Sequence, residues 1–446
     1  MHRSINKFVT YTFSCAVLFS FCYSASAQNV RQKTITRIFW QDRESQKLSY
    51  ADLATTDKWH IKRGWVKGFP QPANINHTLG PMLLNGTQLL VGTVGENENK
   101  LIKIDSGVYQ RPHGSHFHWE YTNVPQSNFQ LQMSSAFKLA STTPRSAFYN
   151  LTSGGFAKAD WNSSNANASS FNVGGKQGAL AIANETVGYA AWPDTEGENA
   201  GRVDVFSPHA NPSSSAYKFN LPAGGIRAAA AASNKIFFSN QDGISWVTAD
   251  ISLSKREQNI PVAKIANSSI DELGSVPREF TSEWNWLLFV TSNSDGQANL
   301  GMINATTPNP NVLKLNIPIE KGLVLSAPST KLSLGKRYAF LFQERADAAS
   351  DLQEKLVVVE LDPNHDGSFS DASVKAMVNV GKSKIDGEFG HHNICFDDYG
   401  RFAVFTDPGD GIINIMTLND LTVRAKFRVG GNPDRIVAVG SPEHFH

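Results

Sequence analysis

The sequence predicts an all-β protein with the β-propeller fold, from a recurring strand pattern, hairpin partners for most of these strands, and a turn-rich composition. The recurring pattern is an alternating apolar run that ends in or near Asp, Ser, Thr or Asn. Its last four copies begin 56 residues apart, at Ile244, Leu300, Leu356 and Ile412. Alternation with a period of two is typical of a half-buried strand. Charged residues make up only 18% of the chain, which also contains 34 glycines and favours strands joined by turns.

Earlier copies of the pattern, and a second strand before most copies, complete the repeat. The earlier copies begin at Leu48, Leu101, Phe156 and Val203. The preceding strands begin at Leu89, Val187, Lys235, Trp286, Tyr338 and Phe402. Repeats of about 40 to 56 residues with four short strands indicate a propeller, because one such sheet cannot cover both of its faces whereas radially stacked sheets can. We count eight units, or seven if one unit is irregular.

The two ends of the chain predict how the ring closes. The last full unit runs from about His392 to Val429, and the apolar run that follows it, 434–439, has no unit of its own. The first unit starts at Thr36 and lacks an innermost strand. We therefore expect the C-terminal strand to complete the first blade, so that residues 28–446 form a single propeller domain; the alternative is a frayed tail.

The N-terminus has the pattern of a secretory signal peptide. Residues 1–27 combine a basic start, an apolar core from Phe8 to Tyr23 and a small-residue cleavage site at Ala25-Ser26-Ala27. The apolar core is too short for a membrane span. The mature chain keeps only Cys395, which excludes an intramolecular disulfide. We expect a periplasmic monomer without a membrane anchor.

Charge and motifs exclude two classes of function. The formal net charge is +1, which argues against general nucleic-acid binding. The sequence contains neither a nucleophile elbow nor an H-E-x-x-H zinc motif, and no nucleophile stands beside a base. The prediction is that the protein is not an enzyme.

Three of the 12 histidines lie within six residues, at His113, His116 and His118. On an extended segment His116 and His118 share one face and are close enough to bind one ion. Neutral imidazole is a common zinc or copper ligand. Because two ligands bind weakly, His113, Glu120 or a distant residue would complete the site. The alternative is a polar loop without a metal.

A second pair, His391 and His392, lies in the turn that leads into the innermost strand of a blade (a lead-in turn). Lead-in turns converge on the mouth of a propeller channel, so one of these histidines would face the axis and bind metal. The alternative is a structural histidine that hydrogen-bonds within the turn.

Four further turns, also interpreted as lead-in turns, carry arginine: Arg145, Arg227, Arg278 and Arg435. If they converge, the channel mouth would bind an anionic ligand or a protein partner through planar fork contacts. The alternative is that each arginine pairs with a neighbouring acid such as Glu279 or Asp434.

The segment 362–373 resembles a calcium-binding loop. Gly367 permits its turn, but Ser373 stands where the twelfth-position glutamate is usual, and Asp371 would have to substitute. The candidate Ca²⁺ ligands are Asp362, Asn364, Asp366, Ser368 and Asp371. The alternative is a solvated turn.

Two segments resemble known families. The final unit, 390–411 followed by 429–439, resembles YncE-like bacterial propellers. The strand ending at Asp105, followed by His113-Gly-Ser-His-Phe-His, resembles AztD-type periplasmic zinc metallochaperones. That resemblance implies a propeller that passes zinc to the solute-binding protein of an ABC transporter. It implies zinc ligands at His113, His116 and His118, and at His391 or His392. Lead-in turns where it would place further histidines hold 176–178 (Lys-Gln-Gly) and 224–225 (Gly-Gly) instead.

Overall fold

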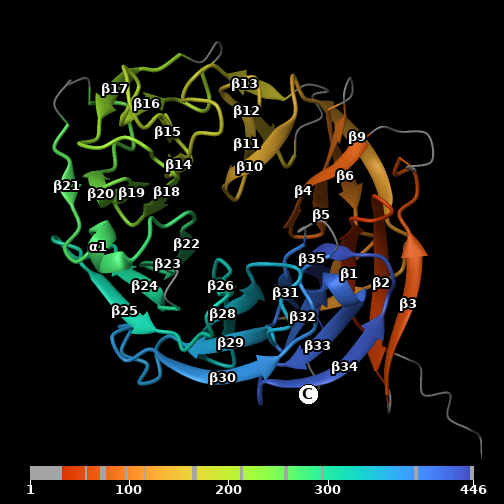
Figure 1. Cartoon of the computed structure of the whole chain (residues 1–446). Coiled ribbons are helices and arrows are strands. Elements are labelled where there is room, and N and C mark those ends of the chain that lie inside the picture. Colours follow the sequence, from red (N-terminus) through yellow and green to blue (C-terminus); the bar gives the residue numbers. More distant parts are fainter. Residues whose placement is uncertain are drawn as a thin grey trace, which may run out of the picture.

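Eight sheets are arranged radially around a central opening in the computed structural model of the chain (Figure 1). The structure describes residues 33–55, 58–70, 77–95, 99–114, 116–162, 168–210, 214–255, 260–292, 296–385 and 390–441. The predicted signal peptide lies outside these residues. No helix within these ranges is long and apolar enough to span a membrane.

The strands of each sheet are given from the channel outward, and the sheets are numbered as blades 1 to 8. Blade 1 contains β35 (Pro433–Val439), β1 (Lys33–Asp42), β2 (Lys47–Thr55) and β3 (Trp59–Trp65). Blade 2 contains β4 (His77–Asn85), β5 (Gln88–Gly95), β6 (Lys100–Asp105) and β9 (Gln126–Gln132). Blade 3 contains β10 (Phe137–Thr142), β11 (Ser146–Leu151), β12 (Phe156–Asp160) and β13 (Ser169–Phe171). Blade 4 contains β14 (Leu180–Ala183), β15 (Val187–Ala191), β16 (Arg202–Phe206) and β17 (Tyr217–Asn220).

The remaining blades follow the same order. Blade 5 contains β18 (Ala228–Ala232), β19 (Lys235–Asn240), β20 (Gly243–Thr248) and β21 (Ala263–Lys264). Blade 6 contains β22 (Thr281–Glu283), β23 (Trp286–Ser292), β24 (Ala298–Asn304) and β25 (Val312–Asn316). Blade 7 has β26 (Leu323–Leu325) and β27 (Ser329–Ser333) along β28 (Lys336–Arg345), then β29 (Lys355–Glu360) and β30 (Ser373–Asn379). Blade 8 contains β31 (Ile394–Phe396), β32 (Phe402–Asp407), β33 (Ile412–Thr417) and β34 (Thr422–Arg428).

Four elements lie outside this scheme. A separate hairpin is formed by β7 (Tyr109–His113) and β8 (His116–Glu120), and α1 (Ile270–Leu273) and the 3₁₀ turn η2 (Pro408–Asp410) are single turns. The recurring sequence pattern corresponds to the third strand of every blade: β2, β6, β12, β16, β20, β24, β29 and β33. The predicted eight-bladed propeller is therefore confirmed.

The C-terminal strand closes the ring as predicted. β35 pairs antiparallel with β1, with Arg37 opposite Val439 and Trp40 opposite Ile436. The buried Thr36 hydroxyl adds hydrogen bonds to the carbonyl oxygens of Val439 (3.0 Å) and Gly440 (3.2 Å). Blade 1 is thus built from both ends of the described chain, and this pairing closes the ring between blades 1 and 8.

Each pair of neighbouring blades encloses one cluster of buried apolar residues, which gives eight clusters in the described part of the chain. The cluster between blades 8 and 1, for example, joins Val404 and Ile413 to Ile38 and Ala51. Burial of these faces is the main stabilising contribution to the ring, because each sheet alone would expose them to water.

The antiparallel register defines two ends of the ring. β35 begins opposite Asp42, the last residue of β1, so the lead-in turns and the turns between second and third strands share one end (the lead-in end). Side chains from one blade hold the lead-in region of the next. Gln41 Nε2 donates to Gly80 O (3.0 Å), Asn150 Nδ2 to Gly178 O (2.7 Å), and Ser239 Oγ to Pro277 O (2.5 Å). These bonds fix the positions of loops that would otherwise be held only by their flanking strands.

Candidate functional site

The histidine-rich segment forms the β7–β8 hairpin, inserted between the third and fourth strands of blade 2. In its register Tyr109 pairs with Glu120, Arg111 with His118, and His113 with His116. Residues directly opposite each other share a face, as do alternate residues along a strand. Positions 109, 111, 113, 116, 118 and 120 therefore lie on one face (the histidine face).

The other face of the hairpin packs on the propeller. Trp119 is only 7% exposed and belongs to the apolar cluster between blades 1 and 2, whereas Phe117 is 50% exposed. The histidine face is opposite this packed face. His118 is half-buried, and the side chains of His113 and His116 lie outside the described part of the structure.

Glu120 already has a cationic neighbour on the histidine face. Its Oε1 lies 3.3 Å from Arg111 Nη1, and the arginine is largely exposed. An exposed pair of this kind contributes about 0–1 kcal/mol, so exchange of the arginine for a metal ion would cost little. Among side chains that the structure describes, no three or more of His, Cys, Asp and Glu are grouped to hold a metal.

One buried arginine of blade 1 forms hydrogen bonds with both ends of this insertion. Arg37 is 3% exposed and forms a bidentate pair with Asp52, with Nε–Oδ1 at 2.6 Å and Nη2–Oδ2 at 3.0 Å. Its Nη1 donates to Ser106 O and to Asn123 O, both at 2.7 Å. These carbonyls stand where the chain leaves β6 and where it returns toward β9. Sequence reasoning missed this residue, although a charged side chain within the apolar run 35–40 was a signal of a buried ion pair.

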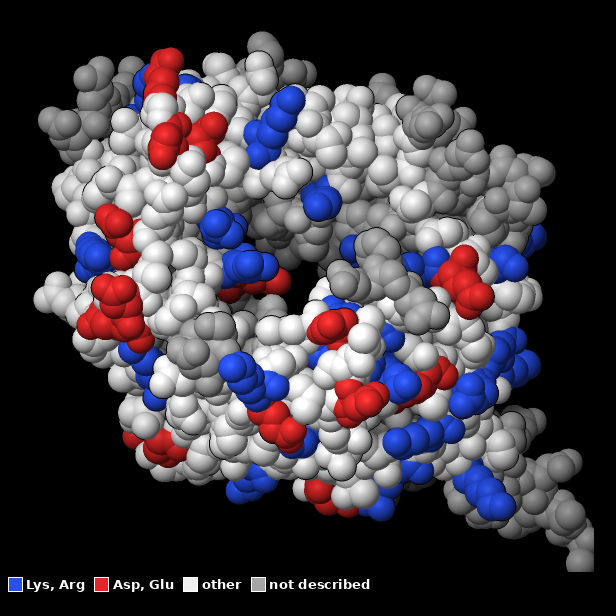
Figure 2. Space-filling view, in the orientation of Figure 1, with Lys and Arg blue, Asp and Glu red and all other residues white. Residues whose placement is uncertain are grey.

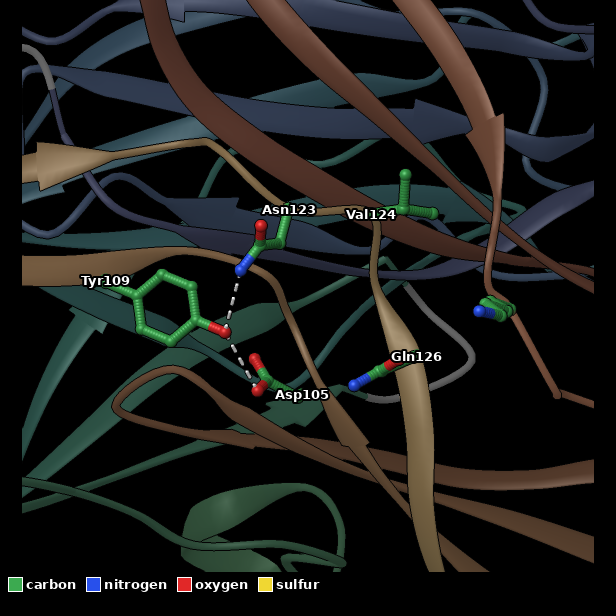
Figure 3. Close-up of a pocket in the computed structure, with 6 residues that line it drawn as sticks. Asp105, Tyr109, Asn123, Val124 and Gln126 are labelled. Carbon is green, nitrogen blue, oxygen red and sulfur yellow. Dashed lines mark hydrogen bonds between the residues drawn. The ribbon is translucent and has the colours of Figure 1, made fainter.

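An open pocket of about 430 Å³ lies where the hairpin joins blade 2 (Figure 3). Tyr109 Oη donates to Asp105 Oδ2 (3.1 Å), and Asn123 Nδ2 donates to Tyr109 Oη (3.4 Å) (Figure 3). The lining residues are Lys67, Asp105, Tyr109, Asn123, Val124 and Gln126. This chain of hydrogen bonds joins the hairpin to Asp105 of blade 2, in addition to the contact of Arg37 from blade 1.

The second predicted histidine site lies in the lead-in turn of blade 8 and is an ion network. The ring of His392 is fully buried, stacked on Phe342 with ring centroids 4.7 Å apart. Its Nε2 lies 2.9 Å from Glu354 Oε2, and its Nδ1 lies 2.6 Å from Thr406 O. Both ring nitrogens are thus occupied, as in a structural histidine. His391 is exposed, with Nδ1 2.7 Å from Glu344 Oε2.

Opposing effects determine the charge of this network. Burial alone lowers the pKa of His392, but the carboxylates of Asp407 (3.3 Å from Nδ1), Glu354 and Glu344 outweigh it and raise the pKa to about 10. Burial likewise raises the pKa of Glu354, but hydrogen bonds from His392, Arg345 and Ser383 outweigh it and lower the pKa to about 2. A protonated imidazole has no free lone pair for a metal, so the geometry favours the structural alternative for His392.

We expect the stability of the protein to fall at alkaline pH through His392. Its folded pKa of about 10 lies above the ordinary value of 6.5, so its contribution is fully present below pH 6.5 and is lost as the pH rises toward 10. Urea unfolding at about pH 6 and about pH 9.5 measures this loss. The decline should be steeper in the natural protein than in His392→Gln, which cannot titrate. Equal slopes for the two proteins would contradict the assignment.

The arginines do not form a single group. The prediction that Arg145 lies in a lead-in turn is wrong: the residue is in the short turn between β10 and β11, at the opposite end of the ring, where its Nε pairs with Glu185 Oε2 at 3.2 Å. Arg435 lies near the start of β35, and its Nη1 donates to Gly80 O. The neighbouring acid Asp434 pairs instead with Arg43, at 3.1 Å. Arg227 and Arg278 are in lead-in turns, as predicted.

The proposed calcium loop connects β29 and β30. The carboxylate of Asp362 accepts the backbone N–H groups of Asp366 (3.0 Å) and Gly367 (3.1 Å), and Asp366 Oδ1 accepts that of Ser368 (2.7 Å). Asn364 N donates to Asp371 Oδ2 at 3.2 Å. These bonds are those of a self-supporting turn, and calcium binding at these residues stays a prediction.

No family model and no curated protein matches this chain. Among solved structures, AztD from Citrobacter koseri is similar with a TM-score of 0.59 and 14% identity, covering 93% of this chain and 100% of that one. Its apo form gives a TM-score of 0.57 and 15% identity, over 92% and 100% of the two chains. The dihydro-heme d1 dehydrogenase NirN gives a TM-score of 0.52 and 12% identity, over 92% and 76%.

At these identities the comparisons show the fold and leave the activity open, because AztD and a protein named as a dehydrogenase both share it. The resemblance to AztD-type propellers that the sequence indicates is confirmed over nearly the whole of both chains, as a shared β-propeller architecture.

Proposed function

We propose that the protein is a periplasmic zinc-binding propeller, without catalytic activity, that passes zinc to the solute-binding protein of an ABC transporter. The observation that carries the proposal is the histidine face, which brings positions 113, 116, 118 and 120 together on one side of a short hairpin. The shared architecture with AztD supports it. Zinc is the cargo of this site.

The hairpin suits capture and release. Imidazole nitrogen and carboxylate oxygen are ordinary zinc ligands, and four of them are enough for a tetrahedral site. The histidine face is opposite the side that packs on the propeller, so a partner protein can approach it. Ligands of the partner would replace those of the hairpin one at a time, which avoids release of the free ion. Binding should weaken on acidification, because protons compete for the imidazole nitrogens.

Zinc titration of the purified protein tests the proposal. We expect the natural protein to bind one zinc ion at micromolar concentration or below, and His116→Ala/His118→Ala to bind it at least about a hundredfold more weakly, because a site left with two ligands is weak. The matched control is His60→Ala/His209→Ala, which removes two exposed histidines far from the hairpin in sequence. Equal binding by the two double variants, or no binding by the natural protein below about millimolar zinc, would refute the role of the hairpin.

A further inference from the structure

We propose that the lead-in end of the channel contains a separate binding site for a small oxyanion, formed by cationic side chains of blades 4, 5 and 6. The three residues are Lys176, Arg227 and Arg278 (the basic arc). Each lies in the lead-in turn of its blade, before β14, β18 and β22 respectively. Figure 2 shows basic side chains at the rim of the central opening over this sector.

The two arginines are held next to each other by one buried residue. Ser239 is 0% exposed, and its carbonyl oxygen accepts the backbone N–H of Arg227 at 3.0 Å. Its hydroxyl donates to the carbonyl oxygen of Pro277, the residue before Arg278, at 2.5 Å. The backbone carbonyl and the hydroxyl of this single residue therefore connect Arg227 to the residue before Arg278, although 51 positions separate residues 227 and 278 in the sequence.

All three side chains are exposed to solvent. Among the described residues, none accepts a hydrogen bond from them or forms an ion pair with them. Arg37, Arg145, Arg202, Arg337 and Arg345, in contrast, each pair with a carboxylate. Glu279 follows Arg278 directly and is exposed, but among the described residues no ion pair joins its carboxylate to Arg227 or to Arg278. Since the formal net charge is only +1, the unpaired charge of the arc is a local feature.

The turns that carry Arg227 and Lys176 are packed on, or hydrogen-bonded to, the preceding blade. A Cβ atom on Gly224 would lie 2.7 Å from Asp194 O, so this turn packs directly on blade 4, and Gly225 has a φ of +65°. The turn of Lys176 is fixed by Asn150, whose Oδ1 accepts Gln177 N–H at 3.0 Å and whose Nδ2 donates to Gly178 O. Turns held by such contacts reduce the ordering cost of binding.

The strand next to the basic arc carries small side chains. The innermost strand of blade 5 is a run of five alanines, Ala228–Ala232, with small side chains beside the channel. Guanidinium groups bind carboxylate and phosphate oxygens through paired N–H donors, and an ammonium group adds a point charge. The chemistry therefore selects a small, multiply charged oxyanion.

Thermal unfolding in the presence of inorganic phosphate or citrate, at constant ionic strength and without zinc, tests this site. We expect a saturable rise of the Tm above that in sodium chloride, and binding at least about tenfold weaker for each arginine removed in Arg227→Ala and Arg278→Ala. Higher ionic strength should weaken the binding. The control is Arg145→Ala, an arginine at the opposite end that pairs with Glu185.

Three results would overturn the proposal: no stabilisation of the natural protein beyond that of chloride, retention of the effect in Arg227→Ala/Arg278→Ala, or equal loss in the Arg145 control. None of them bears on the hairpin, because zinc is absent from this experiment and the histidines stay intact.

Discussion

Replacement of Glu354 by glutamine is expected to lower the free energy of unfolding by about 3–5 kcal/mol, as measured by urea denaturation near neutral pH. The Glu354 side chain is 1% exposed, and its carboxylate lies between two cations, with Oε1 3.0 Å from Arg345 Nε and Oε2 2.9 Å from His392 Nε2. It also accepts the N–H (2.6 Å) and hydroxyl (2.7 Å) of Ser383. An amide cannot accept all these bonds, and Arg345 would stay buried without its carboxylate partner, whereas His392 would keep only Asp407 within ion-pair distance, at 3.3 Å.

The matched control for this substitution is Glu320→Gln in the same blade. Glu320 Oε1 pairs with Lys355 Nζ at 2.8 Å, but its side chain is 53% exposed. Water replaces such a pair easily, so its loss should cost less than about 1 kcal/mol. If the two substitutions destabilise the protein equally, the buried network does not hold the lead-in turn of blade 8 as we describe.

Local sequence signals predicted the architecture because propeller strands are specified locally. The alternation in the run from Leu356 is visible without knowledge of its neighbours, and the same holds for each third strand. Closure was also predictable, since a strand pattern at 434–439 without a unit of its own matched a first unit that lacked one. Both features depend on period and order along the chain, which the sequence contains directly.

Turn identity was harder to predict, and Arg145 shows why. The turn between β10 and β11 spans residues 143–145, and a proline and an arginine there resemble a lead-in turn such as that before β22. The true lead-in turn of blade 3, residues 133–136, carries no charged residue. Both kinds of turn need the same residue types, so composition alone cannot assign either one to an end of the ring.

Contacts between blades were outside the reach of the sequence. Glu354 meets His392 across 38 positions, and Arg37 meets Ser106 and Asn123 across 69 and 86 positions. Nothing in the local pattern names these partners, because they depend on how two sheets face each other. The histidines of the hairpin could be identified from the sequence, whereas the groups that position the hairpin required the structure.

The role of Arg37 leads to the second large effect: Arg37→Met should destabilise the protein by about 3 kcal/mol and loosen the β7–β8 hairpin. Methionine keeps much of the buried volume but leaves Asp52 without its cation, and it leaves Ser106 O and Asn123 O without a donor. Hydrogen–deuterium exchange of residues 109–120 measures the local part of the effect. The substitution should increase the exchange rate there more than it does in the strands of blades 4 and 5.

A second arginine of blade 1 provides the control that distinguishes the role of Arg37 from the loss of any arginine in this blade. Arg63 also donates to two carbonyl groups, those of Val429 (3.0 Å) and Arg428 (2.5 Å), but in an exposed position. Arg63→Met should therefore leave the exchange of 109–120 unchanged. Arg37→Lys should give an exchange rate between those of the natural protein and Arg37→Met, because one ammonium group cannot reach Ser106 O, Asn123 O and Asp52 together. If the hairpin binds zinc, Arg37→Met should also weaken that binding with every histidine intact, since the ion must then order the hairpin. Unchanged exchange in Arg37→Met would show that Trp119 and the Asp105–Tyr109–Asn123 chain hold the hairpin without the arginine.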